Sequence, residues 1–168
     1  MRHTTHVTLL RFTLRPGQSI VEQLLFAAQK AFLSRFDYLL DLKGQQIEFG
    51  THEAPEMPAA DARSQFQTVA GRPVVSTSLG SLVFDSGAAD LTLFGARATT
   101  PTLEMFTMTG TLRVGTAWSK LVIDGRTFWR GDAIVVPHSA ETGAAGLLPA
   151  NLFKAVYVSN SSGYLVFH

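Results

Sequence analysis

Strand-forming residues and turn residues follow one another most clearly over residues 121–137, LVIDGRTFWRGDAIVVP. Asp124-Gly125 stands between apolar residues of high β-propensity. This dipeptide favours a type I′ hairpin turn, because both central residues of that turn need a positive φ. Gly131-Asp132 is a second turn signal. Ala133–Val136 is then a short apolar run, closed by Pro137, that is typical of a buried strand. The segment therefore predicts three strands joined by two tight turns.

The same succession of short apolar runs and turn residues continues over the rest of the chain from Gln65 onward. The runs are Phe66–Ala70, Val74–Ser78, Ser81–Phe84, Leu91–Phe94, Leu103–Met108, Thr111–Val114, Trp118–Ile123, Thr127–Arg130, Ala133–Val136, Phe153–Ser159 and Tyr164–Phe167. No helical pattern lies between them. The predicted fold class is therefore mainly β, a single-domain antiparallel sandwich or jelly-roll-like barrel.

Two stretches near the C-terminus predict connections rather than strands. Gly143–Pro149, GAAGLLP, is interpreted as a loop, and Asn160–Gly163, NSSG, as a hairpin turn. The apolar run Tyr164–Phe167 that follows is expected to pair within the sheet, because an apolar strand is rarely left with a free edge.

The N-terminal part contains one predicted strand and the only clear helical pattern of the sequence. Thr5–Arg15 alternates as a half-buried strand does. Ser19–Glu22 fits a capping box and begins an amphipathic helix predicted to span about residues 19–40. Phe26 and Leu33 lie on the side of this helix away from its main apolar face. We interpret them as candidate interface residues. The alternative is that a loop or a second layer of the same chain covers them.

Residues 44–50 predict a turn and a short strand, with Ile47 and Phe49 on one side. Residues 51–64, THEAPEMPAADARS, contain prolines and charges that oppose regular pairing and predict a surface loop or arm. The first 50 residues are too few to bury a core of their own. We therefore expect one domain over 1–168: a strand–helix–strand start over 1–50, the loop or arm over 51–64, and a β-rich body over 65–168.

The composition points towards contacts with other chains. Only 16% of residues are charged, against about 25% in an average soluble domain, so part of the surface is expected to be hidden in subunit contacts. The alternative is that Ser, Thr and Gly supply the missing polarity. A net charge of +1 offers no field that would attract nucleic acid. No apolar stretch reaches the roughly 20 residues of a membrane helix, which predicts a soluble chain made in the cytoplasm or carried by an assembly.

Candidate chemistry is sparse, and we predict no catalytic, cofactor-binding or metal-binding residue. The chain has no cysteine. Its histidines, His3, His6, His52, His138 and His168, show no ligand spacing, and are interpreted as scattered surface residues. His3 and His6 would point to opposite faces of a strand.

Two further features have competing interpretations. Arg130-Gly131-Asp132 matches a tripeptide that integrins recognise, but it is interpreted here as a turn between strands. Trp118 and Trp129 flank the central hairpin. They are predicted to pack in the core, or alternatively to line a pocket.

The run IDGRTFWRGDAIVVP, Ile123–Pro137, resembles part of a cupin hairpin, in which a turn, a Gly-Asp pair and an apolar strand ending in Pro occur in this order. Metal-using cupins carry a histidine-and-glutamate motif upstream. The matching region here, near Thr109 to Trp118, has no histidine. The resemblance therefore implies a jelly-roll-like barrel without the metal.

In its composition and its pattern of short strands, the whole chain resembles accessory structural proteins of tailed bacteriophage particles, such as decoration, neck or tail components. The likeness lies in the lack of cysteine, the few charges, the many Thr, Ser, Gly and Ala residues and the short strands. It implies a homo-oligomer in contact with other proteins of the same assembly, located in the virion.

Two functions follow as hypotheses. The first is a non-enzymatic structural or assembly protein, without cofactor, nucleic acid or membrane as partner, that acts through subunit contacts. The alternative is a cupin-like small-molecule-binding or enzymatic barrel, with Trp118, Trp129 and His138 near its pocket.

Overall fold

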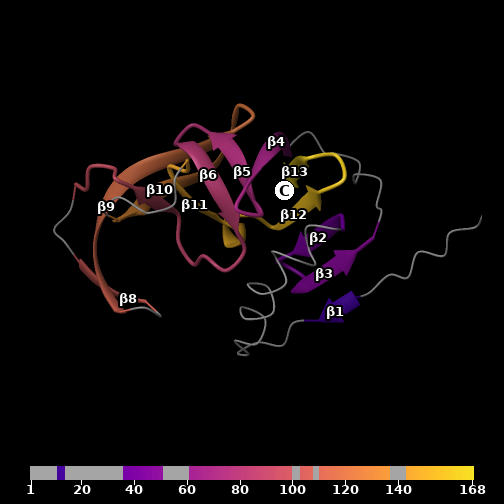
Figure 1. Ribbon diagram of the computed structural model, residues 1–168, viewed down its shortest axis with the longest axis horizontal. Helices are drawn as coiled ribbons and strands as arrows, with labels where there is room; N and C mark the ends of the chain where they lie inside the picture. The colour runs from indigo at the N-terminus through magenta and orange to yellow at the C-terminus, as the bar shows by residue number, and fades with distance from the viewer. Residues whose placement is uncertain (1–10, 14–35, 51–60, 100–102, 108–109, 137–142) are drawn as a thin grey trace, which may run out of the picture.

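The computed structural model describes residues 11–13, 36–50, 61–99, 103–107, 110–136 and 143–168, and the predicted mainly-β class is confirmed for them (Figure 1). The strands are β1 (Arg11–Thr13), β2 (Tyr38–Asp41), β3 (Gln46–Phe49), β4 (Ala62–Val69), β5 (Arg72–Thr77), β6 (Gly80–Asp85), β7 (Thr92–Phe94), β8 (Leu103–Thr107), β9 (Gly110–Ile123), β10 (Arg126–Val136), β11 (Gly146–Pro149), β12 (Ala155–Ser159) and β13 (Tyr164–Phe167), with one 3₁₀ turn, η2 (Ala150–Leu152). Within the described residues, no helix is both long enough and apolar enough to cross a membrane.

These strands form one hydrogen-bonded sheet in the order β1-β3-β2-β12-β13-β4-β5-β6-β11-β7-β10-β9-β8. Most neighbouring strands are antiparallel, but β7 and β10 are parallel, as are β6 and β11. The sheet is therefore mixed, and the expectation of a purely antiparallel sheet is wrong.

Strand β4 divides the sheet into two halves. Its residues Ala62–Gln65 pair with β13, whereas Phe66–Val69 pair with β5. Both halves contribute to one core cluster, for example Leu40 and Leu165 from one side and Leu82 and Leu121 from the other. The two halves therefore bury their apolar faces together, which is the largest favourable contribution to folding.

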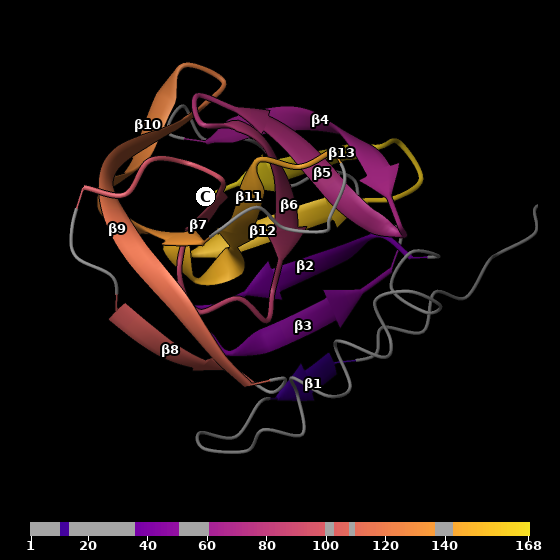
Figure 2. The ribbon, with the colours of Figure 1, turned by 60° about the vertical axis from the view of Figure 1, so that its left-hand side comes forward.

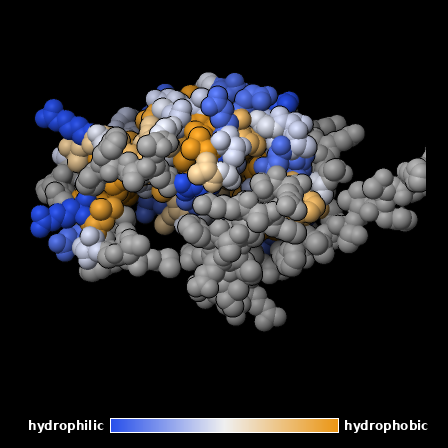
Figure 3. All heavy atoms as spheres, in the orientation of Figure 1, coloured by the Kyte–Doolittle hydropathy of each residue, from blue (hydrophilic) through white to orange (hydrophobic). Residues whose placement is uncertain are grey.

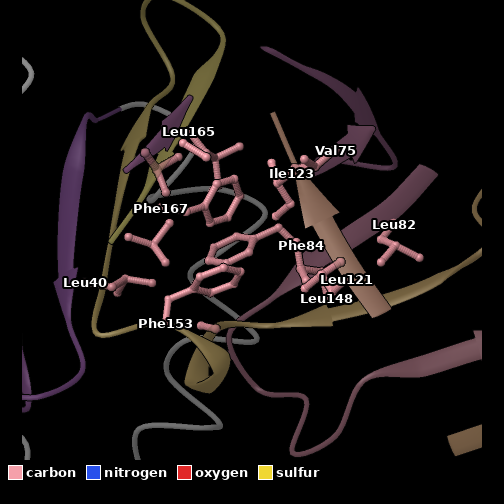
Figure 4. Close-up of a cluster of buried hydrophobic side chains, with 14 of the residues drawn as sticks. Leu40, Val75, Leu82, Phe84, Leu121, Ile123, Leu148, Phe153, Leu165 and Phe167 are labelled. Atoms are coloured by element: carbon pink, nitrogen blue, oxygen red, sulfur yellow. The ribbon is translucent and has the colours of Figure 1, made fainter. Parts of the chain in front are cut away.

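Aromatic rings occupy the middle of this core (Figure 4). The Phe167 ring lies 4.6 Å from that of Phe153 and 6.3 Å from that of Phe84, measured between centroids. Phe128 lies 5.2 Å from Phe153. These separations are those of favourable tilted and edge-to-face ring pairs.

The turn between β5 and β6 also reaches the edge of β9. Ser78 donates its N–H to the Val122 carbonyl over 3.0 Å and its hydroxyl to the Lys120 carbonyl over 2.8 Å. The Val122 N–H donates to Ser78 Oγ over 2.9 Å. These bonds satisfy backbone groups of β9 beyond the segment that pairs with β8.

The helix predicted to span about 19–40 does not extend to its expected end. Residues 38–41 form β2, between β3 and β12. Tyr38 and Leu40 are buried while Leu39 and Asp41 are half-buried, which is the period of a strand. The apolar run suits both structures locally, and two flanking strands decide for β. Residues 19–35, with Phe26 and Leu33, lie outside the described residues.

The central hairpin is partly as expected. Asp124 and Gly125 have φ of 49° and 74° and connect β9 to β10, so the predicted turn is confirmed. The turn predicted at Gly131-Asp132 is wrong, because β10 runs through it. A Cβ on Gly131 would lie 2.9 Å from the Trp129 ring. This glycine therefore makes room for the indole rather than for a turn.

Three segments that were predicted to connect strands are themselves parts of strands. Residues 62–64 of the expected loop belong to β4, where Ala62 is fully buried. Gly146–Pro149 forms β11 between β6 and β7 instead of a loop. The runs expected at 111–114 and 118–123 are one strand, β9. Residues 62–64 and 146–149 are strands because they pair with segments distant in sequence, which local patterns do not signal. β9 instead pairs with its sequence neighbours β8 and β10, and this pairing continues through Gly115 to Ala117.

Other predictions near the C-terminus and in the short N-terminal strand are confirmed. Residues 160–163 form the turn between β12 and β13, and β13 pairs on both edges, with β12 and β4. Ile47 in β3 is buried. Residues 11–13 of the predicted first strand form β1, and residues 51–60 of the predicted loop lie outside the described residues.

Candidate functional site

Trp118 is the most exposed large apolar side chain of the described residues, with 66% of its surface open to solvent. It lies on β9 directly opposite Asp132 of β10. The next pair on the same face is Lys120 and Arg130, because side chains two residues apart share a face of a sheet. All four side chains are exposed. We call this set the Trp118 face.

The Trp118 face carries two cations directly opposite each other, an arrangement that destabilises a sheet by mutual repulsion. Among the described residues, the ion pairs join Arg72 to Asp85 and His168 to Asp61. Lys120 and Arg130 therefore have no carboxylate partner there. Tryptophan and arginine, both of which lie on this face, are also enriched in protein interfaces.

A second feature is the two-stranded ribbon of residues 103–107 and 110–114, which we call the β8–β9 arm. In Figure 1, β8 lies apart from every strand except β9, and Figure 2 shows β8 beside the lower part of β9. Position 103 pairs with Val114 and position 105 with Leu112. Leu112 and Val114 of β9 share one face, on which Val114 is buried and Leu112 is half-buried. On the other face Glu104 is opposite Arg113. β8 is the last strand in the order, and its second edge has no partner among the described strands.

Hydrophobic and hydrophilic residues are both present on the surface at this end of the molecule. In Figure 3, hydrophobic residues lie next to hydrophilic ones over the end where β8 and β9 lie. Near the arm there is an open pocket of about 390 Å³. Its lining is mostly small and apolar, and consists of Gly95, Ala96, Ala98, Arg113, Val114, Gly115, Val135 and Val136. The guanidinium of Arg113 is the charged group of this lining.

Asp37 is a buried carboxylate, positioned just before β2, that binds the turn between β12 and β13. Ser161 donates its hydroxyl to Asp37 Oδ2 over 2.6 Å and its N–H to Oδ1 over 2.9 Å. Ser159 donates its hydroxyl to Oδ2 over 2.9 Å. Asn160 donates its side-chain amide to the Phe36 carbonyl over 2.6 Å. These bonds connect two segments more than 120 residues apart in sequence.

The electrostatics of Asp37 follow from these donors. Burial by itself raises the pKa of the carboxyl group, but the hydrogen bonds from Ser161, from Ser159 and from the backbone N–H of Asn160 outweigh it. The pKa of Asp37 is therefore lowered from its ordinary value of 3.8. Nearby, burial and the negative charge of Asp37 raise the pKa of Tyr157 to about 12. Burial also raises the pKa of Tyr38.

His168 and Asp61 form a second polar contact. His168 Nδ1 lies 2.8 Å from Asp61 Oδ2, and this contact is an ion pair when the imidazole is protonated. No hydrogen bond of good geometry reaches that buried oxygen within the described part of the chain. No group of three or more histidine, aspartate or glutamate side chains there could hold a metal ion.

The structure describes only some of the residues singled out from the sequence, and it does not bring the two tryptophans among them together on one face. Phe26, Leu33, His52 and His138 lie outside the described residues. Trp118 is exposed, so the predicted core position is wrong for it, whereas the half-buried Trp129 packs against the core. Neither tryptophan lines the open pocket.

The Arg130-Gly131-Asp132 tripeptide lies within a strand rather than in a turn. Asp37 had no signal in the sequence, although serines such as Ser161 of NSSG are typical side-chain donors of a turn.

A scan of protein-family models and a search of curated proteins both found no match to the chain.

Proposed function

We propose that this protein is a non-enzymatic structural or assembly protein that acts through contacts between subunits. The observation that supports this most directly is the β8–β9 arm, in which Leu112 and Val114 of β9 share an apolar face and one edge of β8 has no partner among the described strands. The low charge and the abundance of small polar residues, which resemble those of tailed-phage components, favour an assembly in a virion.

Among the described strands, the β8–β9 arm lacks the neighbours that would make it stable by itself. A two-stranded ribbon is marginally stable in water on its own, and it needs a third strand or a packed apolar face. The unpaired edge of β8 is also a template for another strand. A subunit that added a strand to β8 and covered the face containing Leu112 would supply both. On this proposal, the finer fold is a sandwich or jelly-roll-like barrel whose arm reaches its neighbours.

The experiment replaces Leu112, half-buried on the apolar face of the arm, with aspartate. We expect Leu112→Asp to lower the mass of the assembled species in light scattering, because a charge on this face opposes its burial. The matched control is Thr111→Asp on the opposite face, which should leave the mass unchanged. Circular dichroism must show an intact sheet in both. Equal masses for the wild type and both variants would contradict the role of the arm.

A small-molecule-binding barrel is the second candidate, favoured by the open pocket beside Arg113. Bound metal in elemental analysis, or a ligand-induced rise in melting temperature, would support it. Negative results in both measurements would retire it.

A further inference from the structure

We propose that the Trp118 face packs against the same face of a second copy, about a two-fold axis that crosses the strands between its two rows of residues. The first row is Trp118 with Asp132, and the second is Lys120 with Arg130. This inference rests on the proposed assembly role and names one contact of that assembly.

The choice of axis follows from the charges. A two-fold axis across the strands places each row over the other row of the second copy. Trp118 then meets a lysine, as a cation–π pair, and Asp132 meets an arginine, as an ion pair. Symmetry repeats both contacts, so the two molecules share four complementary pairs. A two-fold axis along the strands would instead place Lys120 over Arg130, which is repulsive.

The second copy also removes a cost within each molecule. Lys120 and Arg130 face each other across the strands without a carboxylate partner among the described residues. In the proposed dimer an Asp132 carboxylate approaches this pair from the opposite molecule. The exposed Trp118 ring, open over 66% of its surface, loses contact with water at the same time. An acidic partner of another kind would satisfy the cations but would leave Asp132 facing a like charge.

An exchange of charges tests the symmetry directly. Arg130→Asp and Asp132→Arg, each alone, place like charges over one another, and should weaken self-association by about tenfold or more in sedimentation equilibrium. The double variant with both exchanges restores opposite charges across the axis. It should return to within about threefold of the wild type. Lys43 is exposed and lies away from this face, and Lys43→Asp changes the charge by the same amount as Arg130→Asp. This control variant should leave self-association unchanged.

The outcomes separate this contact from the assembly role as a whole. If the wild type associates but neither single exchange weakens it, the Trp118 face is not the contact while the assembly role stands. If the double exchange stays as weak as the single ones, the partner is not a symmetric second copy, and the proposal is overturned. A dimer that survives Leu112→Asp but not Arg130→Asp supports this face without the arm. A wild type that is monomeric at every concentration overturns both proposals.

Discussion

Asp37 shows how a single side chain joins distant parts of this protein. Its two carboxylate oxygens accept hydrogen bonds from Ser159 and Ser161, so the turn between β12 and β13 is bound to the start of β2. A buried ionised group is costly unless it is hydrogen-bonded, and here three donors within 2.9 Å compensate for its burial. The arrangement gives a role to Ser161 of the NSSG turn and to Ser159, which directly precedes that turn.

Replacing Asp37 with asparagine should destabilise the protein at pH 7 by about 1–3 kcal/mol, because a charged acceptor of buried hydrogen bonds is lost. The folded-state pKa of Asp37 is lowered, so its contribution to stability is fully present above the ordinary value of 3.8. That contribution is lost as the pH falls through the folded-state pKa. Urea unfolding of wild type and Asp37→Asn should therefore differ at pH 7 and converge at low pH.

The exposed Asp90 offers a matched control, since Asp90→Asn should change the stability little at either pH. A difference for Asp37→Asn that stayed constant down to pH 2 would show that the charge of Asp37 is not its source.

Among the elements, β11 depends on a close approach that only glycine permits. Gly146 lies opposite Leu93, and a Cβ at this position would clash with the Thr92 carbonyl and lie 3.1 Å from Leu93 Cα. These are backbone atoms of β7, which cannot rotate away as a side chain can. The short strand therefore joins β6 and β7 because its first residue has no side chain.

Gly146→Ala should destabilise the protein by at least about 1–3 kcal/mol, because β7 and β11 must move apart to accept the methyl group. The measurement is the free energy of unfolding in denaturant. Gly87→Ala is the control, since the nearest atom to its Cβ is Asp85 Oδ1 at 3.4 Å. Similar losses for both variants would rule out the close approach as the cause.

At the scale of the whole molecule, Phe167 joins the two halves of the sheet. It belongs to β13, yet its ring contacts Phe84 of β6 and Phe128 of β10 as well as Phe153. It is fully buried. Because both halves share this cluster, they are expected to unfold together as one cooperative unit.

Phe167→Ala should lower the free energy of unfolding by about 3–5 kcal/mol, because a cavity opens where both halves meet. Phe167→Leu should cost less, and Val69→Ala, at a partly exposed position, should cost little. Calorimetry should show one transition in every variant. Two separate transitions would mean that the halves fold independently, against the single domain expected from the sequence.

Local patterns were sufficient for some elements of this fold. Asp124-Gly125 and Asn160–Gly163 predicted turns that the structure contains, because positive φ and side-chain hydrogen bonding are properties of those residues themselves. The mainly-β class followed from many short strands between such turns. The Trp118 face was not predicted, because a large apolar side chain such as that of Trp118 is expected in the core. Only the pairing of Trp118 with Asp132 shows that it lies on the solvent-exposed face of the sheet.

The sequence by itself therefore determined the class of the fold, several of its turns and the low charge content on which the proposed assembly role partly rests. The tertiary structure decided which apolar runs became strands, as at residues 38–41 and 146–149, since pairing with distant strands outweighs weak local preference. It also decided where Asp37, Gly146 and Trp118 act. The role of each depends on neighbours contributed by remote segments, and those neighbours exist only after the two halves have folded together.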